Sequence, residues 1–533
     1  MHQVDHQLLY QSKKSWWIPS AFGATLLIVA LSTTFVLRIK ADDIWWHLAT
    51  GRFILQTWTL PDLNIYSFTA PNHAWLPHEW LSEVVFYFVY STLGAKGLIA
   101  FGIALNSIAV ALVYKITQRY SESPFLASLI TLLAALMMLG NFSLRPYLFG
   151  NLFFIASIHA MEEPSAGGKL RPLLIFVLFS AWANFHGSFI IGLALIVLYI
   201  AASIAPHMRG KKRSWAPTKA LLVDFGIALV ACTSTPHHIY GLIFPLEYLQ
   251  NAMSGKVSYL TNISEWQSAG FATPLGRMII FYVMFCMFAI AGSGVSPAPI
   301  HIGLLVAFSF FSFSTIRNIP LLGIAATPVL ARHLPKALSR LSRPFGHNSA
   351  LADAIDRFHK NSVATERRSA KLILPVLVSL FLVVVFTVPD KSSISYASTT
   401  GVHGLADLSP GFYPKGLIEQ LAIRAKGRRV FNYFNWGGAI IWSLYPKVKV
   451  FIDQRNDCYP MDVFLDYFAV HEMKRDWKFV LDKWGIDAVA YPPTEKLTKT
   501  LRDDIDWLVV WEDKQAVLLI RDKPEPWRDD TLE

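Results

Sequence analysis

Charged residues are scarce in this chain. Only 16% of its 533 residues are Asp, Glu, Lys or Arg, whereas soluble domains usually hold roughly 25%. Hydrophobic residue types make up 53%. This composition excludes an ordinary soluble protein and indicates a polytopic membrane protein. The net charge of +11 would suggest nucleic acid as the partner of a soluble protein. In a membrane protein, an excess of Lys and Arg in cytoplasmic loops explains this charge. No nucleic-acid partner is therefore expected.

Cysteine is also rare, with only Cys232, Cys286 and Cys458. They lie far apart in the sequence, so they give neither the spacing of a metal site nor a disulfide framework. The chain shows no internal repeat and no low-complexity segment. The first apolar run lacks a small-residue cleavage site and is long enough to span a membrane, so we interpret it as an uncleaved anchor.

Long apolar runs fill most of the first 389 residues. A helix needs about 20 apolar residues to cross a bilayer. On this criterion the sequence predicts about 11 transmembrane helices, at 18–38, 96–116, 123–140, 147–161, 171–186, 188–205, 219–235, 276–293, 297–313, 315–331 and 371–389. The stretch 79–92 is shorter and carries Glu79 and Glu83, so we expect it to lie on the membrane surface as an interfacial helix.

The distribution of Lys and Arg sets the expected orientation. With a cytoplasmic N-terminus, HMRGKKR (207–213) and the basic linker 332–371 fall in the cytoplasm, as the positive-inside rule requires. Counting 79–92 as a span would place HMRGKKR outside. The chain is therefore expected to divide into a transmembrane domain, 1–389, whose first outer loop covers 39–95, and an extracytoplasmic domain, 390–533.

The C-terminal part has the pattern of a small α/β domain. KVKVFID (447–453), IDAVAYPP (486–493) and AVLLIRD (516–522) are predicted as strands, because β-branched and apolar residues dominate them. The stretch 461–485 is predicted as one helix that ends at Gly485. Alternation of strand and helix is typical of this fold class.

Unusual polar and aromatic residues collect on the expected outer face. They are Asp42, Asp43, Trp46, His47, His78 and Glu79 in the first outer loop, and Arg145, His186, His237, His238, Glu265 and Arg317 in later outer loops. Any one of them alone is more often a helix cap or an interfacial group than a ligand. Their joint occurrence on one face favours a functional site.

These residue types suit one kind of substrate. A carboxylate can deprotonate or orient a hydroxyl or amide, Arg and His can hold a phosphate, and aromatic rings pack on the faces of sugars. A sugar linked to a lipid phosphate presents all of these features at the membrane boundary. On this hypothesis Arg317, Arg145, His237 and His238 hold the carrier phosphate.

The first outer loop carries a family resemblance. DDIWWHLATGRFILQTWTLP (42–61) resembles the acidic motif that follows the first span in the GT-C superfamily of membrane glycosyltransferases, notably the lipid A aminoarabinose transferases and protein O-mannosyltransferases. The sequence is also similar to a group of uncharacterised bacterial membrane proteins with D-x-W-W-H-L-A-T-G and H-E-W-L motifs. The resemblance implies an inverting transferase that uses a polyprenyl-phosphate-linked sugar, with Asp43 as the catalytic carboxylate and Asp42 as the alternative.

A second resemblance lies in the C-terminal domain. NYFNWGGAIIWSLYPKVKVFIDQRND (432–457) is similar to the region around the WWDYG motif of oligosaccharyltransferase catalytic subunits, although the Asp of that motif is missing. It implies that Trp436, Asp453 and Arg455 close the cleft. Asp453, Arg455 and Asp457 also fit a plain salt bridge at a strand end, and both interpretations stay open.

The sequence thus predicts a glycosyltransferase in the inner membrane of a bacterium, acting on its outer face. His47, Trp46, His78, Glu79, His186 and Glu265 would line its cleft. A divalent metal held by Asp43 and Glu265 stays open, and no other cofactor is expected. The acceptor could be a protein, a lipid or a glycan. A transporter or flippase, and a non-catalytic scaffold with a binding outer domain, are the alternatives.

Overall fold

A computed structural model describes residues 43–121, 123–141, 143–163, 168–210, 214–253, 264–342 and 414–522. Four predictions from the sequence fall wholly or largely outside these ranges. They are Asp42, the spans 18–38 and 371–389, and the linker 332–371 beyond Ser342.

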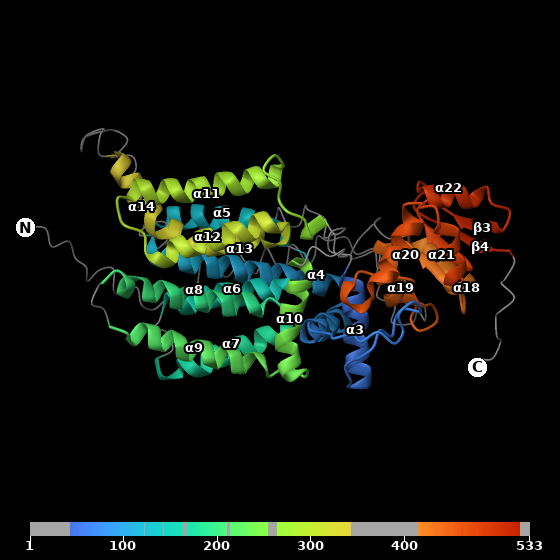
Figure 1. Ribbon diagram of the computed structural model, residues 1–533, viewed down its shortest axis with the longest axis horizontal. Coiled ribbons are helices and arrows are strands. Elements are labelled where there is room, and N and C mark those ends of the chain that lie inside the picture. Colours follow the sequence, from blue (N-terminus) through green and yellow to red (C-terminus); the bar gives the residue numbers. More distant parts are fainter. Residues whose placement is uncertain are drawn as a thin grey trace, which may run out of the picture.

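The first part of the chain is a bundle of helices that run along the long axis of the molecule (Figure 1). Its helices are α4 (Trp80–Tyr120), α5 (Pro124–Met138), α6 (Tyr147–Glu162), α7 (Arg171–Phe185), α8 (Phe189–Met208), α9 (Ala216–Cys232), α11 (Pro274–Ser293), α12 (Pro299–Ser314), α13 (Ile319–Ala325) and α14 (Thr327–Ser342). Two helices run across this direction, α3 (Ile44–Thr57) and α10 (His238–Met253) (Figure 1).

Each predicted span between residues 96 and 313 corresponds to one helix. The helix α4 bends at Gly94, whose φ of 67° is not helical, between the predicted interfacial stretch and the following span. Within the described residues, Gly97–Tyr120, Phe189–Met208 and Pro274–Ser293 are long and apolar enough to cross a membrane, and Pro124–Met138, Pro299–Ser314 and Ile316–Ala325 are shorter apolar helices. The chain is therefore an integral membrane protein, but the count of about 11 spans is not confirmed.

The predicted span 315–331 is broken. It contains the short helix α13, and a second helix, α14, begins at Thr327. Pro328 stands at the second position of α14, where a proline is tolerated because its missing N–H would have no partner inside the helix. Pro328 would interrupt a helix that continued from α13, because it cannot donate the backbone hydrogen bond that a helix interior needs. The apolar run therefore gives two helices instead of one.

The described C-terminal residues fold around a sheet of four strands in the order β1-β2-β4-β3. The strands are β1 (Val430–Asn432), β2 (Ala488–Tyr491), β3 (Trp507–Glu512) and β4 (Val517–Arg521). The first two strands pair in parallel and the other two pairs are antiparallel. The helices of this unit are α18 (Lys415–Arg424), α19 (Gly437–Leu444), α20 (Met461–His471), α21 (Trp477–Lys483) and α22 (Lys496–Arg502). The prediction of a mainly helical chain with a small sheet is confirmed.

Two sequence predictions in this unit are wrong in detail. The stretch 447–453 is not a strand of the sheet, because only Val450 forms isolated bridges, to Val430 and to Ser67 of the first outer loop. The predicted helix 461–485 is two helices, α20 and α21. The chain turns between them at Met473, which has a φ of 56°, and the amide of Lys474 closes the end of α20 by donating to Ala469 O at 2.8 Å.

The first outer loop and the C-terminal unit share one hydrophobic core. It joins Trp45, Phe86 and Trp75 to Phe431 and Ile440. A polar contact reinforces it, since Arg52 of α3 donates to Trp442 O of α19 at 3.0 Å and stacks over the Trp442 indole at 4.4 Å. A separate core lies inside the helical bundle.

Candidate active site

Asp43 is placed by α3, because it is the residue that begins this helix. The helix lies very close to the start of α4. A Cβ on Gly51 would stand 2.1 Å from the Glu83 carbonyl oxygen and 2.8 Å from Tyr87 Cβ. Only glycine allows this approach. Gly51, the last residue of the DDIWWHLATG motif, therefore lets α3 pack against α4, and this packing sets the position of Asp43.

Asp43 begins a chain of four charged side chains. Its Oδ2 lies 2.9 Å from Arg145 Nε, and Arg145 also donates to Glu265 Oε2 at 2.7 Å. Glu265 Oε1 lies 3.8 Å from Arg317, whose guanidinium stacks over Trp266 at 5.1 Å. Asp43 and Arg145 are each 20% exposed. Four separate segments of the sequence are thus brought to one partly accessible place.

The two carboxylates of this chain have opposite electrostatic environments. Burial raises the pKa of Asp43, and it outweighs the opposing effect of Arg145. Burial also acts on Glu265, but Arg317 and Arg145 together outweigh it and lower the pKa of that carboxyl. Asp43 is therefore a better proton acceptor than an ordinary aspartate, and Glu265 is held as an anion.

A second group of side chains surrounds Glu79. Its Oε1 lies 3.2 Å from His186 Nε2 and 3.7 Å from His78 Nε2. The Ser188 amide donates to His186 Nδ1 at 3.1 Å, so in the neutral ring the proton is on Nε2, the nitrogen that lies next to Glu79.

Asp457 adds a contact from the C-terminal unit, since its Oδ2 lies 3.9 Å from His78 Nδ1. The sequence analysis considered Asp457 only as part of a strand-end salt bridge and not as a residue of the cleft, although the alternating acidic and basic pattern D-Q-R-N-D around it was a usable signal. The Glu79 group therefore joins the first outer loop, the turn between α7 and α8, and the C-terminal unit.

His47 does not line an open cleft. It is 2% exposed and its Nδ1 lies 3.2 Å from Glu83 Oε1, a carboxyl that is 1% exposed. The Trp46 and His47 rings are in contact, with centroids 3.6 Å apart. The sequence analysis named Glu83 as an acid of the interfacial stretch 79–92 but did not propose it as a site residue. The signal for it was a second acid four residues after Glu79 on one helix, an arrangement that costs energy unless a partner is present.

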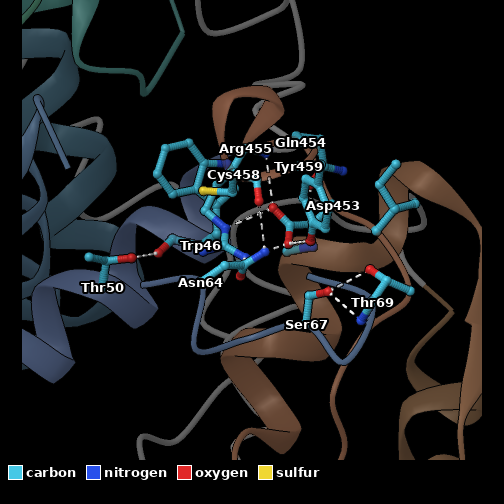
Figure 2. A network of polar contacts seen from close by, with 12 residues as sticks. Trp46, Thr50, Asn64, Ser67, Thr69, Asp453, Gln454, Arg455, Cys458 and Tyr459 are labelled. Carbon is cyan, nitrogen blue, oxygen red and sulfur yellow. Dashed lines mark hydrogen bonds and ion pairs between the residues drawn. The ribbon is translucent and has the colours of Figure 1, made fainter. Parts of the chain in front are cut away.

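Asp453 and Arg455 form a fully buried, bidentate ion pair at the junction of the first outer loop and the C-terminal unit (Figure 2). Arg455 Nε donates to Asp453 Oδ1 at 2.8 Å and its terminal nitrogen donates to Oδ2 at 2.7 Å. That nitrogen also donates to Asn64 Oδ1 at 2.9 Å, and the Tyr459 hydroxyl donates to Asp453. The salt-bridge interpretation of this pair is the one that the geometry favours.

The remaining candidates lie around these groups. Trp436 is 6% exposed and packs edge-on against Tyr433. His237 is half-buried and His238 is exposed at the start of α10. Within the described ranges, no group of three or more His, Cys, Asp or Glu side chains could hold a metal ion. Asp43 and Glu265, the pair considered for a divalent metal, both bind Arg145.

Comparison with known proteins gives matches at the level of structure. No protein-family model matches the chain, and no curated protein matches it in sequence. It is similar to the oligosaccharyltransferase of Archaeoglobus fulgidus in the apo form, with a TM-score of 0.47 and 11% identity over 90% of this chain and 70% of that one.

It is also similar to ArnT from Cupriavidus metallidurans. The TM-score is 0.45 to the form bound to undecaprenyl phosphate and 0.46 to the apo form, each with 14% identity over 93% of this chain and 97% of that one. Both proteins are glycosyltransferases of the GT-C superfamily.

Proposed function

We propose that this chain is an integral membrane glycosyltransferase that moves a sugar from a polyprenyl-phosphate-linked donor to an acceptor on the outer face of the membrane. The observation that carries the proposal is the chain Asp43–Arg145–Glu265–Arg317. It combines a carboxylate of raised pKa with two arginines that share an anionic partner.

In the proposed reaction Asp43 accepts the proton of the acceptor's hydroxyl or amide as that group attacks the anomeric carbon. The bond between this carbon and the phosphate oxygen breaks, and the polyprenyl phosphate leaves with its electron pair. Attack from the side opposite to the phosphate inverts the anomeric centre. This requires the base and the phosphate site to lie on opposite sides of the sugar.

Arg145 and Arg317 would bind the phosphate. Both guanidiniums contact the Glu265 carboxylate, so a phosphate oxygen entering between them would replace one anion by another. His237 and His238, at the start of α10, would hold the carrier phosphate together with the two arginines. Asp42 remains the alternative base.

The other candidates have supporting parts in this proposal. Glu79, His78 and His186 would line the side of the cleft that faces α8, next to Trp46 and the buried His47. Asp453 and Arg455 would act by holding the C-terminal domain on the first outer loop, and Trp436 would pack within that domain. The domain division at residue 389, the extracytoplasmic location of the C-terminal domain and the bacterial inner membrane belong to the same proposal.

The test follows the donor, because its consumption can be measured without knowing the acceptor. Purified protein in lipid nanodiscs is given a panel of radiolabelled undecaprenyl-phosphate sugars together with a cell-envelope extract, and release of the labelled sugar from the lipid is measured. Asp43→Asn is expected to lower this rate on the order of 100-fold or more while donor binding persists.

Asp476→Asn is the matched control. Asp476 begins α21 as Asp43 begins α3, and neither side chain caps its helix. This variant should retain the full rate. Full turnover by Asp43→Asn would refute the proposed role of Asp43, and donor binding without turnover in the unmodified protein would favour the non-catalytic scaffold.

A further inference from the structure

The helix α10 runs across the end of the helical bundle instead of along it (Figure 1). It follows α9 after only the five residues 233–237. Gly241 makes this return possible, because a Cβ there would stand 2.6 Å from Thr235 Oγ1. The helix is therefore held close against the turn from which it emerges.

The inner face of α10 contacts the first outer loop. Gly241 is buried, and the ring of Phe244 lies 5.3 Å from the ring of His78. His78 contacts Glu79, which binds His186, three residues before α8 begins. These contacts place α10 at the level where α8, a helix long and apolar enough to cross the membrane, reaches its N-terminal end.

One stripe of the outer face of α10 is apolar and exposed, and the exposed Glu247 borders it. Ile239, Ile243 and Leu246 are 58%, 40% and 47% exposed, and their spacing of four and three residues places them on one stripe of the helix. Tyr240, beside the stripe, is 52% exposed. Contiguous apolar surface of this kind normally marks contact with a membrane or another molecule.

The depth of α10 identifies what covers this stripe. The preceding helix α9 also exposes apolar side chains, ending with Val230 at 63% exposure close to its C-terminus. The apolar side chains of α9 that would face the hydrocarbon region therefore continue up to the turn before α10. A helix with an apolar stripe at the end of a membrane-spanning bundle lies in the interface between acyl chains and headgroups, where a tyrosine is favoured.

We propose that α10 is an interfacial helix whose Ile239–Ile243–Leu246 stripe inserts into the outer leaflet of the membrane. Its partner is the boundary of lipid acyl chains and headgroups. Because Phe244 on the opposite face packs against His78, the depth of α10 in the leaflet also fixes the position of His78 beside Glu79. This inference does not depend on the reaction that the site performs.

Site-directed spin labelling in lipid nanodiscs tests the inference. A label at Ile243→Cys is measured for collisions with oxygen, which concentrates in lipid, and with a water-soluble nickel chelate. All three native cysteines are buried, so the added cysteine is the reactive one, and unmodified protein provides the blank. Val306→Cys on α12, at an apolar position 65% exposed, supplies the lipid reference, and Glu472→Cys, an exposed position of the C-terminal unit, supplies the aqueous reference.

The label at Ile243 is expected to resemble that at Val306, with oxygen collisions several-fold more frequent than at Glu472 and few nickel collisions. Ile239→Cys, on the same stripe, repeats the measurement with a second variant. Nickel access equal to that at Glu472 would mean that the stripe faces water. A rigid label that neither reagent reaches would mean that protein covers it, either another part of this chain or a second copy. Either result would overturn the proposal.

Discussion

The buried ion pair between Asp453 and Arg455 gives a quantitative prediction about the junction that it forms. Arg455→Met removes both bonds to Asp453, the bond to Asn64 and the stacking of the guanidinium on Tyr66 and Trp75 at 4.7 and 4.6 Å. It leaves the Asp453 carboxylate, which is 0% exposed, without its cation. Breaking a buried pair in this way costs about 3–5 kcal/mol.

The expected effect is local opening of the junction, and Cys458 reports it. This thiol is 0% exposed, and the chain holds it at the same place, because Asn64 Nδ2 donates to Cys458 O at 3.1 Å and the Cys458 amide donates to Arg455 O at 3.0 Å. Since each ~1.4 kcal/mol is a factor of ten, Arg455→Met should accelerate labelling of Cys458 by a factor on the order of 100 to several thousand when opening is faster than the chemical step.

The assay uses protein with Cys232→Ala and Cys286→Ala in nanodiscs, a maleimide reagent and mass spectrometry. The Arg455 charge lowers the pKa of the Cys458 thiol against the stronger effect of burial. Loss of this charge alone would therefore slow labelling, so faster labelling reports opening and not a more reactive thiol.

Two variants decide the interpretation. Arg428 pairs with Asp487 at 3.6 Å near the surface of the same unit, where their side chains are 29% and 15% exposed. Ion pairs that water reaches contribute about 1 kcal/mol or less, so Arg428→Met should change labelling less than about fivefold. Combining Arg455→Met with Asp453→Leu removes the orphaned carboxylate and should recover most of the protection. Labelling that Arg455→Met accelerates no more than Arg428→Met would refute the reasoning.

Two further predictions concern the position and basicity of Asp43. Arg145→Gln removes the strongest charge that lowers the pKa of Asp43, so that pKa should rise further and the acidic limb of the pH–rate profile should move to higher pH. Arg317→Gln should mainly raise the KM for the donor. Equal pH–rate profiles for the two variants would contradict this assignment. Gly51→Ala forces α3 away from the Glu83 carbonyl and should lower the free energy of unfolding by about 1–3 kcal/mol. This is measured as a lower Tm together with a lower rate of sugar release. Gly226→Ala on α9 is the control, because a Cβ there meets nothing within 4 Å, and it should leave the rate unchanged and Tm unchanged or slightly raised.

The helices of the bundle were predictable because a long apolar run is a local signal. The run 188–205 corresponds to α8 (Phe189–Met208) and the run 276–293 to α11 (Pro274–Ser293). The signal fails where a proline divides one run into two helices, as at Pro328. It also fails in the C-terminal unit, where Val450 pairs with Ser67 and Val430. That pairing depends on a segment nearly 400 residues away.

The candidate site shows the same limit. The sequence placed Asp43, Arg145, Glu265 and Arg317 on one face, because each one follows or precedes an apolar run, and the structure joins them in one chain of contacts. The sequence alone could not distinguish these four residues from Asp453 and Arg455, which carry the same charges. The difference is burial by Asn64, Tyr66 and Trp75, and a local pattern does not contain it.

The position of Arg145 between two carboxylates couples the two halves of the proposed reaction. Arg145 contacts both Asp43 and Glu265, and its charge lowers the pKa of each. A donor phosphate that binds Arg145 and Arg317 would compensate part of this charge. The pKa of Asp43, already raised by burial, would then rise further, and Asp43 would become a stronger base only when the donor is in place.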